Sequence, residues 1–474
     1  MTATIQRQSA LLIILLVICW AGFAPAENAG SAELTKRESV NAETVLELAE
    51  DVGRWLASHA TTTPAGITWP DNALKPETSS YDLASGVAGK VVYFTALYRA
   101  TKNPGYLDMA RGGADYLVSV VQDPALFDEN PRRASLYTGI SGIGVALLHA
   151  QEHLPDPKYK KTVTQVIEQL KQWSVSEATG LRWSEEFNDL IYGDAGTALF
   201  LAYVAEQTGN KNARDMAQQS AQFLLGQAQQ TQDGSFWHFR RSKPFNLPNF
   251  SHGTAGIAYV LATIGTLSDD ESLREGARAG FDYIRSIAVI ENGEIRIPYG
   301  WGSESWDGLY EFGWAHGLVG TAAFFRRLQV SNIDASTAAE YENLSLHTLL
   351  NIGLPGAPSE PFAEPSTSDD MRFGRAGVLS LLSQCCDNES GDDDIVGVRT
   401  ALWSYIEEAA VRENRMAHWE VDAPAFMGGG RAAYTGIFHG AAGIGLAVLR
   451  LHARLEGKQA YLRLPDDPFV WPAN

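Results

Sequence analysis

The stretch NFSHGTAGIAYVLATIG, from Asn249 to Gly265, decides the fold. It joins a Gly-x-x-Gly motif to an Ala-rich apolar run, and a helix that is apolar around most of its circumference belongs inside a protein. Six further Gly-x-x-Gly motifs stand at the front of similar runs. The seven copies begin at Gly86, Gly139, Gly193, Gly253, Gly317, Gly374 and Gly440. A motif that returns at this fairly regular spacing indicates a repeat architecture.

Longer amphipathic segments lie between the apolar runs, and a charged face opposite an apolar stripe suits an outer layer. The chain is therefore predicted to be all-α, an α/α toroid of seven outer and seven inner helices. Glycine at the start of each inner helix permits close backbone approach and, in some copies, positive φ. Strand-like runs such as GSFWHF and EIRIPY predict short β hairpins at one rim. The predicted outer helices are Ala42–His59, Tyr106–Val121, Lys158–Trp173, Asn212–Gln229, Glu271–Ile287, Ala338–Ile352 and Ile395–Val411.

Composition narrows the class of protein. The 474 residues are 45% hydrophobic and 20% charged, which is typical of a globular chain and not of a disordered one. The formal charge of -19 argues against binding of nucleic acid or of anionic membranes. Only 3 cysteines are present, which excludes a disulfide-framework scaffold.

Residues 1–26 are predicted to be a cleaved signal peptide. Arg7 supplies the positive charge, Ala10 to Ile18 form the apolar core, and Ala24-Pro25-Ala26 offers the cleavage site. Residues 27–42 are expected to be a flexible lead-in, and residues 43–474 a single toroid domain. We therefore expect export, to a bacterial periplasm or to the medium, and no membrane attachment after cleavage.

The rim at which the inner helices begin is the expected site. Seven converging helix N-termini would favour a carboxylate or another anionic group there. Seven tryptophans fall in the connections that lead to this rim, where they either contact a ligand or cap the core. They are Trp69, Trp183, Trp237, Trp301, Trp306, Trp314 and Trp419.

The repeated motif, with Ser-His-Gly in copy four and Trp-x-x-Gly in copy five, resembles the lanthionine synthetase C-like family over Val45 to Leu455. The resemblance implies an α/α toroid with a zinc ion in its central cavity. It also implies a peptide substrate, because the family's cyclases add a cysteine thiol to a dehydroalanine or dehydrobutyrine.

Two residues match the family's catalytic positions. Asp189 stands four residues before Gly193, and His252 directly precedes Gly253. An imidazole beside a carboxylate is suited to proton transfer near neutral pH. The other interpretation is that Asp189 caps a turn and His252 only lines the cavity. Further cavity-lining candidates are Tyr192, Glu311, Trp314, His316 and His439.

The family's zinc ligands are missing. Ala315, Arg372 and Phe373 stand where the resemblance implies two cysteines and a histidine, and Glu311 stands where the cyclases tend to carry an arginine. An alternative zinc site would use His252, His316 and His439, each of which precedes the first glycine of its copy. No cofactor is assigned. The adjacent Cys385 and Cys386 follow the sixth inner helix, away from the expected site.

Three functions stay open: a peptide-modifying, cyclase-like or peptide-binding protein, a non-enzymatic binding scaffold, and a carbohydrate-active α/α-barrel enzyme. The third would need two suitably spaced carboxyl groups. Candidates are Glu185, Glu186, Asp189, Asp194, Asp307 and Glu311. The substrate, any metal and the oligomeric state remain open.

Overall fold

The computed structural model describes residues 40–302, 306–352, 368–385, 393–423 and 429–467. The predicted signal peptide, nearly all of the predicted lead-in and Cys386 lie outside these residues. The described part is mostly helical, as expected, with seven inner and seven outer α-helices. The inner helices are α3 (Val87–Thr101), α5 (Ile140–Ala150), α7 (Asp194–Thr208), α9 (Thr254–Leu267), α11 (Leu318–Val330), α13 (Arg375–Gln384) and α15 (Ala441–Leu455). The outer helices are α2 (Ala42–Ser58), α4 (Pro104–Val121), α6 (Pro157–Trp173), α8 (Lys211–Gly226), α10 (Glu271–Ile287), α12 (Ala335–Ile352) and α14 (Asp393–Ala409).

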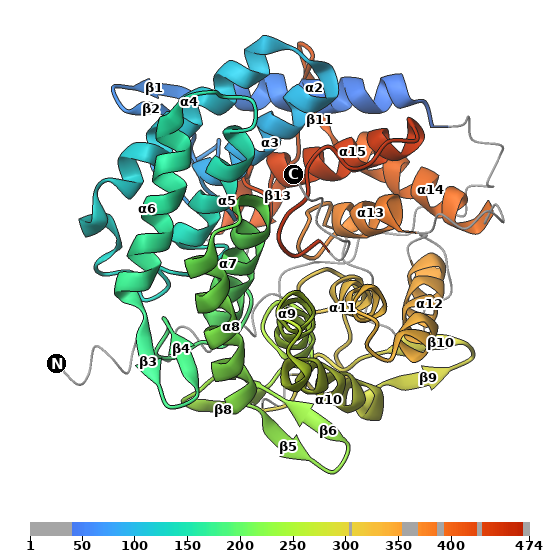
Figure 1. Ribbon diagram of the computed structural model, residues 1–474. Coiled ribbons are helices and arrows are strands. Elements are labelled where there is room, and N and C mark those ends of the chain that lie inside the picture. The colour runs from blue at the N-terminus through green and yellow to red at the C-terminus, as the bar shows by residue number, and fades with distance from the viewer. Residues whose placement is uncertain (1–39, 303–305, 353–367, 386–392, 424–428, 468–474) are drawn as a thin grey trace.

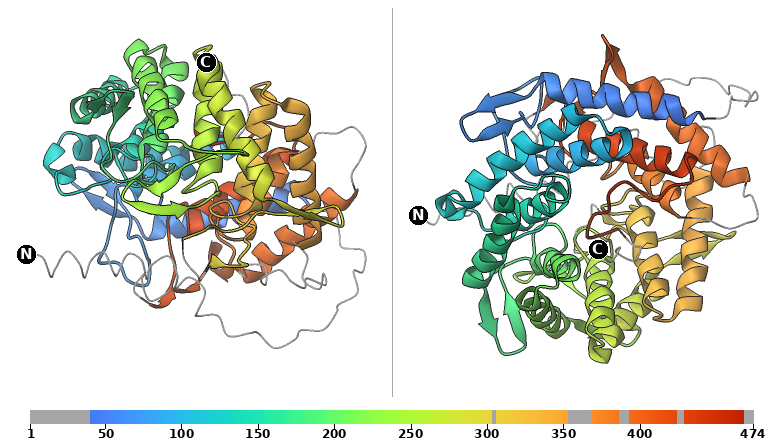
Figure 2. Two further views of the ribbon diagram at one scale, coloured as in Figure 1. Left: turned by 90° about the horizontal axis from the view of Figure 1, so that it is seen from below. Right: turned by 45° about the horizontal axis from the view of Figure 1, so that its top comes forward.

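The helices form a closed ring, seen along its axis in Figure 1 and from two further directions in Figure 2. The last inner helix, α15, packs against both α2 and α3, so the end of the repeat array meets its beginning. Burial separates the two layers. All of α5 is buried, whereas α10 buries only one face. The predicted toroid is confirmed.

The two layers begin their helices differently. Five outer helices start behind a side chain that accepts a backbone N–H, namely Asn41, Asn103, Asp156, Asn210 and Asp270. The inner helices start behind a glycine without a side-chain cap. Their first N–H groups donate instead to carbonyls seven residues earlier, as Thr254 does to Leu247 at 3.0 Å. The expected anion site of free helix N-termini is therefore wrong, because the preceding loop already bonds these groups.

The second glycine of each motif allows this loop to fold back. A Cβ at Gly256 would lie 1.9 Å from the carbonyl oxygen of Phe250, and the other six copies show the same conflict with the residue six positions earlier. The first glycines have negative φ, for example -145° at Gly253. The prediction of close approach is correct, and the prediction of positive φ is wrong for these glycines.

Backbone hydrogen bonds connect neighbouring copies around the axis. In these bonds a residue two or three positions before the first glycine of one copy donates its N–H to the corresponding carbonyl of the next, and we call this set the collar. Through the backbone alone, it joins neighbouring turns at six of the seven junctions between copies. The collar bonds run from Ala84 to Tyr137, Leu190 to Ser251, Ser251 to Ala315, Ala315 to Arg372, Arg372 to Phe438, and Phe438 to Ala84.

Seven antiparallel two-stranded sheets decorate one rim, as expected. Five of these hairpins follow an outer helix and pack on the next outer helix around the ring; β12, for example, packs on α2. A short 3₁₀ helix, η2 (Pro124–Phe127), follows α4. The strands are β1 (Thr61–Thr63), β2 (Gly66–Thr68), β3 (Val175–Glu177), β4 (Gly180–Arg182), β5 (Gln229–Thr231), β6 (Gly234–Phe236), β7 (His238–Arg240), β8 (Lys243–Asn246), β9 (Val289–Glu291), β10 (Glu294–Arg296), β11 (Val411–Glu413), β12 (Met416–His418), β13 (Val421–Ala423) and β14 (Gly430–Ala432).

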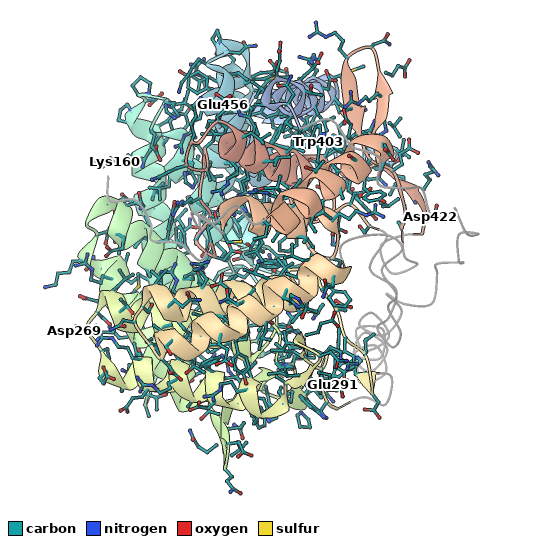
Figure 3. The ribbon with its side chains drawn as sticks, turned by 90° about the vertical axis from the view of Figure 1, so that its right-hand side faces the viewer. Lys160, Asp269, Glu291, Trp403, Asp422 and Glu456 are labelled. Atoms are coloured by element: carbon teal, nitrogen blue, oxygen red, sulfur yellow. The ribbon has the colours of Figure 1, made fainter. Side chains whose placement is uncertain are left out.

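Figure 3 separates the two rims in a side view. Lys160, Asp269 and Glu456, at or near the turns that leave the inner helices, lie towards the left and top. Glu291 and Asp422, in two of the hairpins, lie to the right. The hairpin rim is the one at which the inner helices begin.

The segment that follows α15 closes the other end of the ring. Arg450 makes a two-pronged ion pair with Asp467 at 2.7 and 2.8 Å, and Tyr137 donates to Asp466 at 2.7 Å. A cavity of about 60 Å³ lies between this segment and the inner helices, with Trp314 in its wall. Within the described residues, no helix combines the length and the apolarity that crossing a bilayer requires.

Candidate active site

Two neighbouring turns at the hairpin rim bring Asp189 and His252 together. Asp189 lies in the turn before α7, and His252 lies in the turn before α9. The collar bond from Leu190 N–H to the Ser251 carbonyl, at 3.2 Å, joins the two turns beside these residues. The repeat itself therefore positions the pair.

The pair is short and buried. His252 Nδ1 lies 2.6 Å from Asp189 Oδ2, and the two side chains are 2% and 0% exposed. Asp189 also accepts the Tyr192 N–H at 3.3 Å, so the turn-capping interpretation describes part of its role. The His252 ring packs against both Tyr192 and Phe239, with centroids at 5.3 and 4.6 Å.

Arg372 determines the tautomer of His252. Its Nη2 lies 3.3 Å from Nε2 of the imidazole. A guanidinium can only donate, so Nε2 accepts this bond with its lone pair and Nδ1 carries the hydrogen directed at Asp189. His252 thus has the form of a general base, held by a carboxylate on one side and covered by a cation on the other.

Burial shifts both members of the pair towards their neutral forms. It raises the pKa of Asp189 to about 7. It lowers the pKa of His252 well below its ordinary value, and the guanidinium groups of Arg372 and Arg132 lower this pKa further. The imidazole of His252 is therefore neutral near neutral pH. Asp189 Oδ1 has no hydrogen-bond partner among the described residues.

Four rings extend the site away from this pair. The His316 ring follows His252 at 5.3 Å, Phe373 stacks on His316 at 5.9 Å, and His439 stacks on Phe373 at 5.7 Å. Tyr299 packs on His316 at 4.7 Å. Burial, with His252 and Arg372 nearby, keeps the pKa of His316 well below its ordinary value. Within the described chain, no hydrogen-bond partner reaches the buried His316 Nδ1.

The residues at the implied zinc positions do not fit a zinc ion. Ala315 and Phe373 offer no ligand atom, and the guanidinium of Arg372 brings a positive charge to the place where the metal would sit. The alternative site of His252, His316 and His439 is wrong, because the Phe373 ring lies between the last two histidines. No group of three ligating side chains among the described residues could hold a metal ion.

Glu311 and Trp314, two further residues predicted to line the cavity, lie at different distances from the hairpin rim. Burial raises the pKa of Glu311 to about 7, although the nearby charge of Arg372 opposes this shift. Trp314 lies deeper, packed against Tyr137, Phe250 and Phe438, and lines the cavity below the collar.

Two of the six candidate carboxylates for sugar chemistry are engaged in other contacts. Asp194 accepts the N–H groups of Trp183 and Ser184 and pairs with Arg241. Glu186 pairs with Arg240. The exposed carboxylates are Glu185 and Asp307. Asp189, which is buried, and Glu311, which is half-buried, remain, and the pKa of each is raised to about 7.

Four of the seven rim tryptophans are structural. Each donates its indole N–H to a carbonyl thirteen residues earlier, near the end of the preceding outer helix, at 2.6 to 2.9 Å. This bond satisfies a carbonyl that the helix end leaves free. The capping interpretation is therefore correct for Trp69, Trp183, Trp237 and Trp419.

Sequence reasoning missed several residues of the site. Phe239 comes from β7, Tyr299 follows β10, and Arg132 precedes α5, with its guanidinium 3.9 Å from the Tyr192 ring centroid. Arg372 was noticed only as a missing ligand. Its place two residues before a first glycine, where the collar runs, is a signal that could have placed it at the axis.

Comparison with protein-family models gives one match. A family model described as lanthionine synthetase C-like protein matches residues 77–354, more than half of the chain, and ends before copy six. A comparison with curated proteins found no match.

Among solved structures, a nisin cyclase superposes with a TM-score of 0.59 at 14% identity, covering 90% of this chain and 98% of that chain. The α-1,6-mannanase GH76A of Salegentibacter sp. HEL1_6 superposes with a TM-score of 0.42 at 14% identity, covering 76% of this chain and 99% of that chain. The similarity to the nisin cyclase concerns the fold alone.

Proposed function

The chain belongs to the lanthionine synthetase C-like family, and on this premise we propose that its hairpin rim binds a peptide and transfers protons on it without a zinc ion. The observation that carries the proposal is the buried Asp189–His252 pair, whose Nε2 lone pair faces the guanidinium of Arg372. A base and a fixed cation at one point can accept a proton and hold the anion that remains.

The reaction that fits this arrangement is the addition of a cysteine thiol to a dehydroalanine. His252 Nε2 takes the thiol proton, and Asp189 stabilises the imidazolium that forms. Arg372 moves its hydrogen bond from Nε2 to the new thiolate. The sulfur bonds to the β-carbon, the electron pair of the double bond moves to the α-carbon, and the α-carbon takes up one proton.

A metal ion that binds a thiol stabilises the thiolate form, and in this proposal the positive charge of Arg372 has that role. It does so less strongly than a metal bond, because a hydrogen-bonded ion pair leaves the sulfur its full charge. The proposal therefore favours a slow enzyme, or a peptide-binding protein that retains the proton-transfer pair.

A dehydrated peptide with one cysteine and one dehydroalanine tests the proposal. Ring formation consumes the free thiol, so the product no longer gains mass with an alkylating reagent. We expect wild-type protein to form the ring and His252→Gln to lose about 10²-fold in rate. His347→Gln, an exposed histidine on α12, is the matched control and should keep full activity.

The possible results separate the candidate functions. Folded wild-type protein that neither binds nor cyclises such peptides contradicts the proposal. Binding without turnover would favour the scaffold, and cleavage of a glycan that depends on Asp189 would favour the carbohydrate-active enzyme.

Independence from zinc has its own test. Protein purified without chelators should contain no stoichiometric zinc by elemental analysis, and dialysis against EDTA should leave ring formation unchanged. One zinc per chain, with activity lost on chelation and restored by zinc, would overturn this part of the proposal.

Export completes the proposal. If residues 1–26 are removed as a signal peptide, N-terminal sequencing of the protein recovered from the periplasm or the medium should begin at Glu27. Retention of the full chain in the cytoplasm would contradict it.

A further inference from the structure

The rim holds a second Asp–His pair at the same repeat positions as the first. Asp370 stands four residues before Gly374, and His439 directly precedes Gly440. Asp189 and His252 occupy the same positions three copies earlier in the chain. The same atoms meet, because His439 Nδ1 lies 3.2 Å from Asp370 Oδ2.

Asp370 is held firmly in this pair. Its Oδ1 accepts the backbone N–H groups of Arg372, Phe373 and Gly374 at 2.9, 2.7 and 3.2 Å, which leaves Oδ2 for His439. Burial alone would raise the pKa of Asp370, but the bond to His439 and the backbone N–H groups outweigh it and keep this pKa below its ordinary value.

The second pair faces the same site. The ring of Phe373 stacks between His316 and His439 with interplanar angles of 12° and 28°, so the row of packed rings that begins at His252 continues to His439. The His439 side chain is 17% exposed, and its Nε2 makes no hydrogen bond to the residues that the structure describes. An imidazole that is anchored at Nδ1 and accessible at Nε2 can exchange a proton with a ligand.

We infer that Asp370 and His439 form a second proton-transfer pair, which supplies the proton that the α-carbon takes up after the thiol has added. This inference rests on the proposed function and completes its proton balance. His252 gains the thiol proton, His439 gives one proton to the α-carbon, and exchange with water then removes a proton from His252 and returns one to His439. In this arrangement the peptide lies along the row of packed side-chain rings, with its thiol near His252 and its α-carbon near His439.

The configuration of the product tests the inference directly. A proton delivered by a fixed donor reaches one face of the α-carbon, whereas a proton taken from water reaches both faces. Wild-type protein should therefore give one epimer, and His439→Gln should give both epimers about tenfold more slowly with unchanged peptide affinity. Chiral analysis of the hydrolysed thioether measures the epimers, and a thermal unfolding curve checks that the variant folds.

Histidine NMR with labelled imidazoles supplies a second readout that needs no turnover. The signals of His252 and His439 should both shift when the dehydrated peptide is added, and the signal of exposed His347 should not. Asp370→Asn keeps an oxygen for the backbone N–H groups and is the second variant, which should also give both epimers.

The outcomes distinguish the two proposals. A single epimer at the wild-type rate from His439→Gln, or a peptide-induced shift at His252 alone, overturns the second pair and leaves the proposed function standing. Wild-type protein that binds the peptide without forming a ring overturns proton transfer by either pair. Wild-type protein that does not bind the peptide overturns the proposed function itself.

Discussion

The two Asp–His pairs are built from the same positions of the repeat, yet their surroundings differ. Asp189 and His252 meet at 2.6 Å with both side chains nearly inaccessible, and Arg372 covers the remaining imidazole nitrogen. Asp370 and His439 meet at 3.2 Å, and the second imidazole is partly exposed.

The difference shows how a repeat protein can specialise equivalent positions. The repeat places a carboxylate and an imidazole in contact wherever Asp and His occupy the two positions. Residues from other copies then decide whether the imidazole is desolvated beside a cation or open to a ligand.

The largest effect is expected on the rate of ring formation, which should differ between variants of the two aspartates. Asp189→Asn should slow ring formation by about 10²-fold, because the amide no longer stabilises the imidazolium of His252, whereas Asp370→Asn should cost about tenfold. Asp215→Asn, an exposed residue on α8, is the control. Equal losses from the first two variants would break the distinction between the pairs.

For the stability of the fold, we expect the larger loss at Asp370 and the smaller loss at Asp189. Asp370→Ala removes the acceptor of three backbone N–H groups and should lower the free energy of unfolding by about 2 to 3 kcal/mol, whereas Asp189→Ala should cost about 1 kcal/mol. Urea titrations measure both values. Asn should restore most of the loss at position 370, as its occurrence at Asn249 in the equivalent turn suggests. A larger loss from Asp189→Ala would contradict this order.

Removing the cation should make the first pair more like the second. Arg372→Gln deletes the nearer positive charge that lowers the pKa of His252, so this pKa should rise. An NMR titration of the His252 ring carbon detects the shift, with Arg214→Gln on α8 as the control. The fold should persist, since Arg372 joins the collar only through its backbone. An unchanged pKa would show that the guanidinium does not act on His252.

A further prediction concerns the pH dependence of stability at Glu311. Its pKa is about 7 in the folded protein and 4.5 ordinarily, so the folded state binds the proton more tightly than the unfolded state does. As pH rises from about 4.5 to about 7, wild-type protein should therefore lose stability relative to Glu311→Gln, and above that range the difference should stay constant. Urea midpoints at pH 5, 6, 7 and 8 measure it. A difference that does not change with pH would contradict the raised pKa.

Much of the fold could be predicted because its signal is periodic. The predicted outer helix Ala42–His59 ends one residue beyond the observed helix, and every predicted inner helix begins at its motif. The hairpins followed from short strand-like runs. The positive φ and the free helix N-termini failed because both depend on how the loop before each inner helix folds back, which no local pattern encodes.

Only those site residues that match a motif of the family could be predicted from the sequence. Asp189 and His252 were chosen by resemblance, and the structure brings them into contact. Phe239 and Tyr299 gave no signal, because their connections differ from copy to copy. The prediction of a three-histidine zinc site is wrong because equivalent positions in different copies need not bring their side chains to one point. The ring of Phe373 fills the space between His316 and His439.

The residue pattern was sufficient to predict that seven glycine-led apolar helices are buried inside seven amphipathic ones, because hydrophobic periodicity and close backbone approach are local properties of the chain. It also determined that the ligands of the family's zinc are absent. The contact of Arg372 with His252 and the stacking of Phe373 between His316 and His439 are visible only in the three-dimensional fold. These contacts join residues far apart in the chain, and closure of the ring alone brings them together.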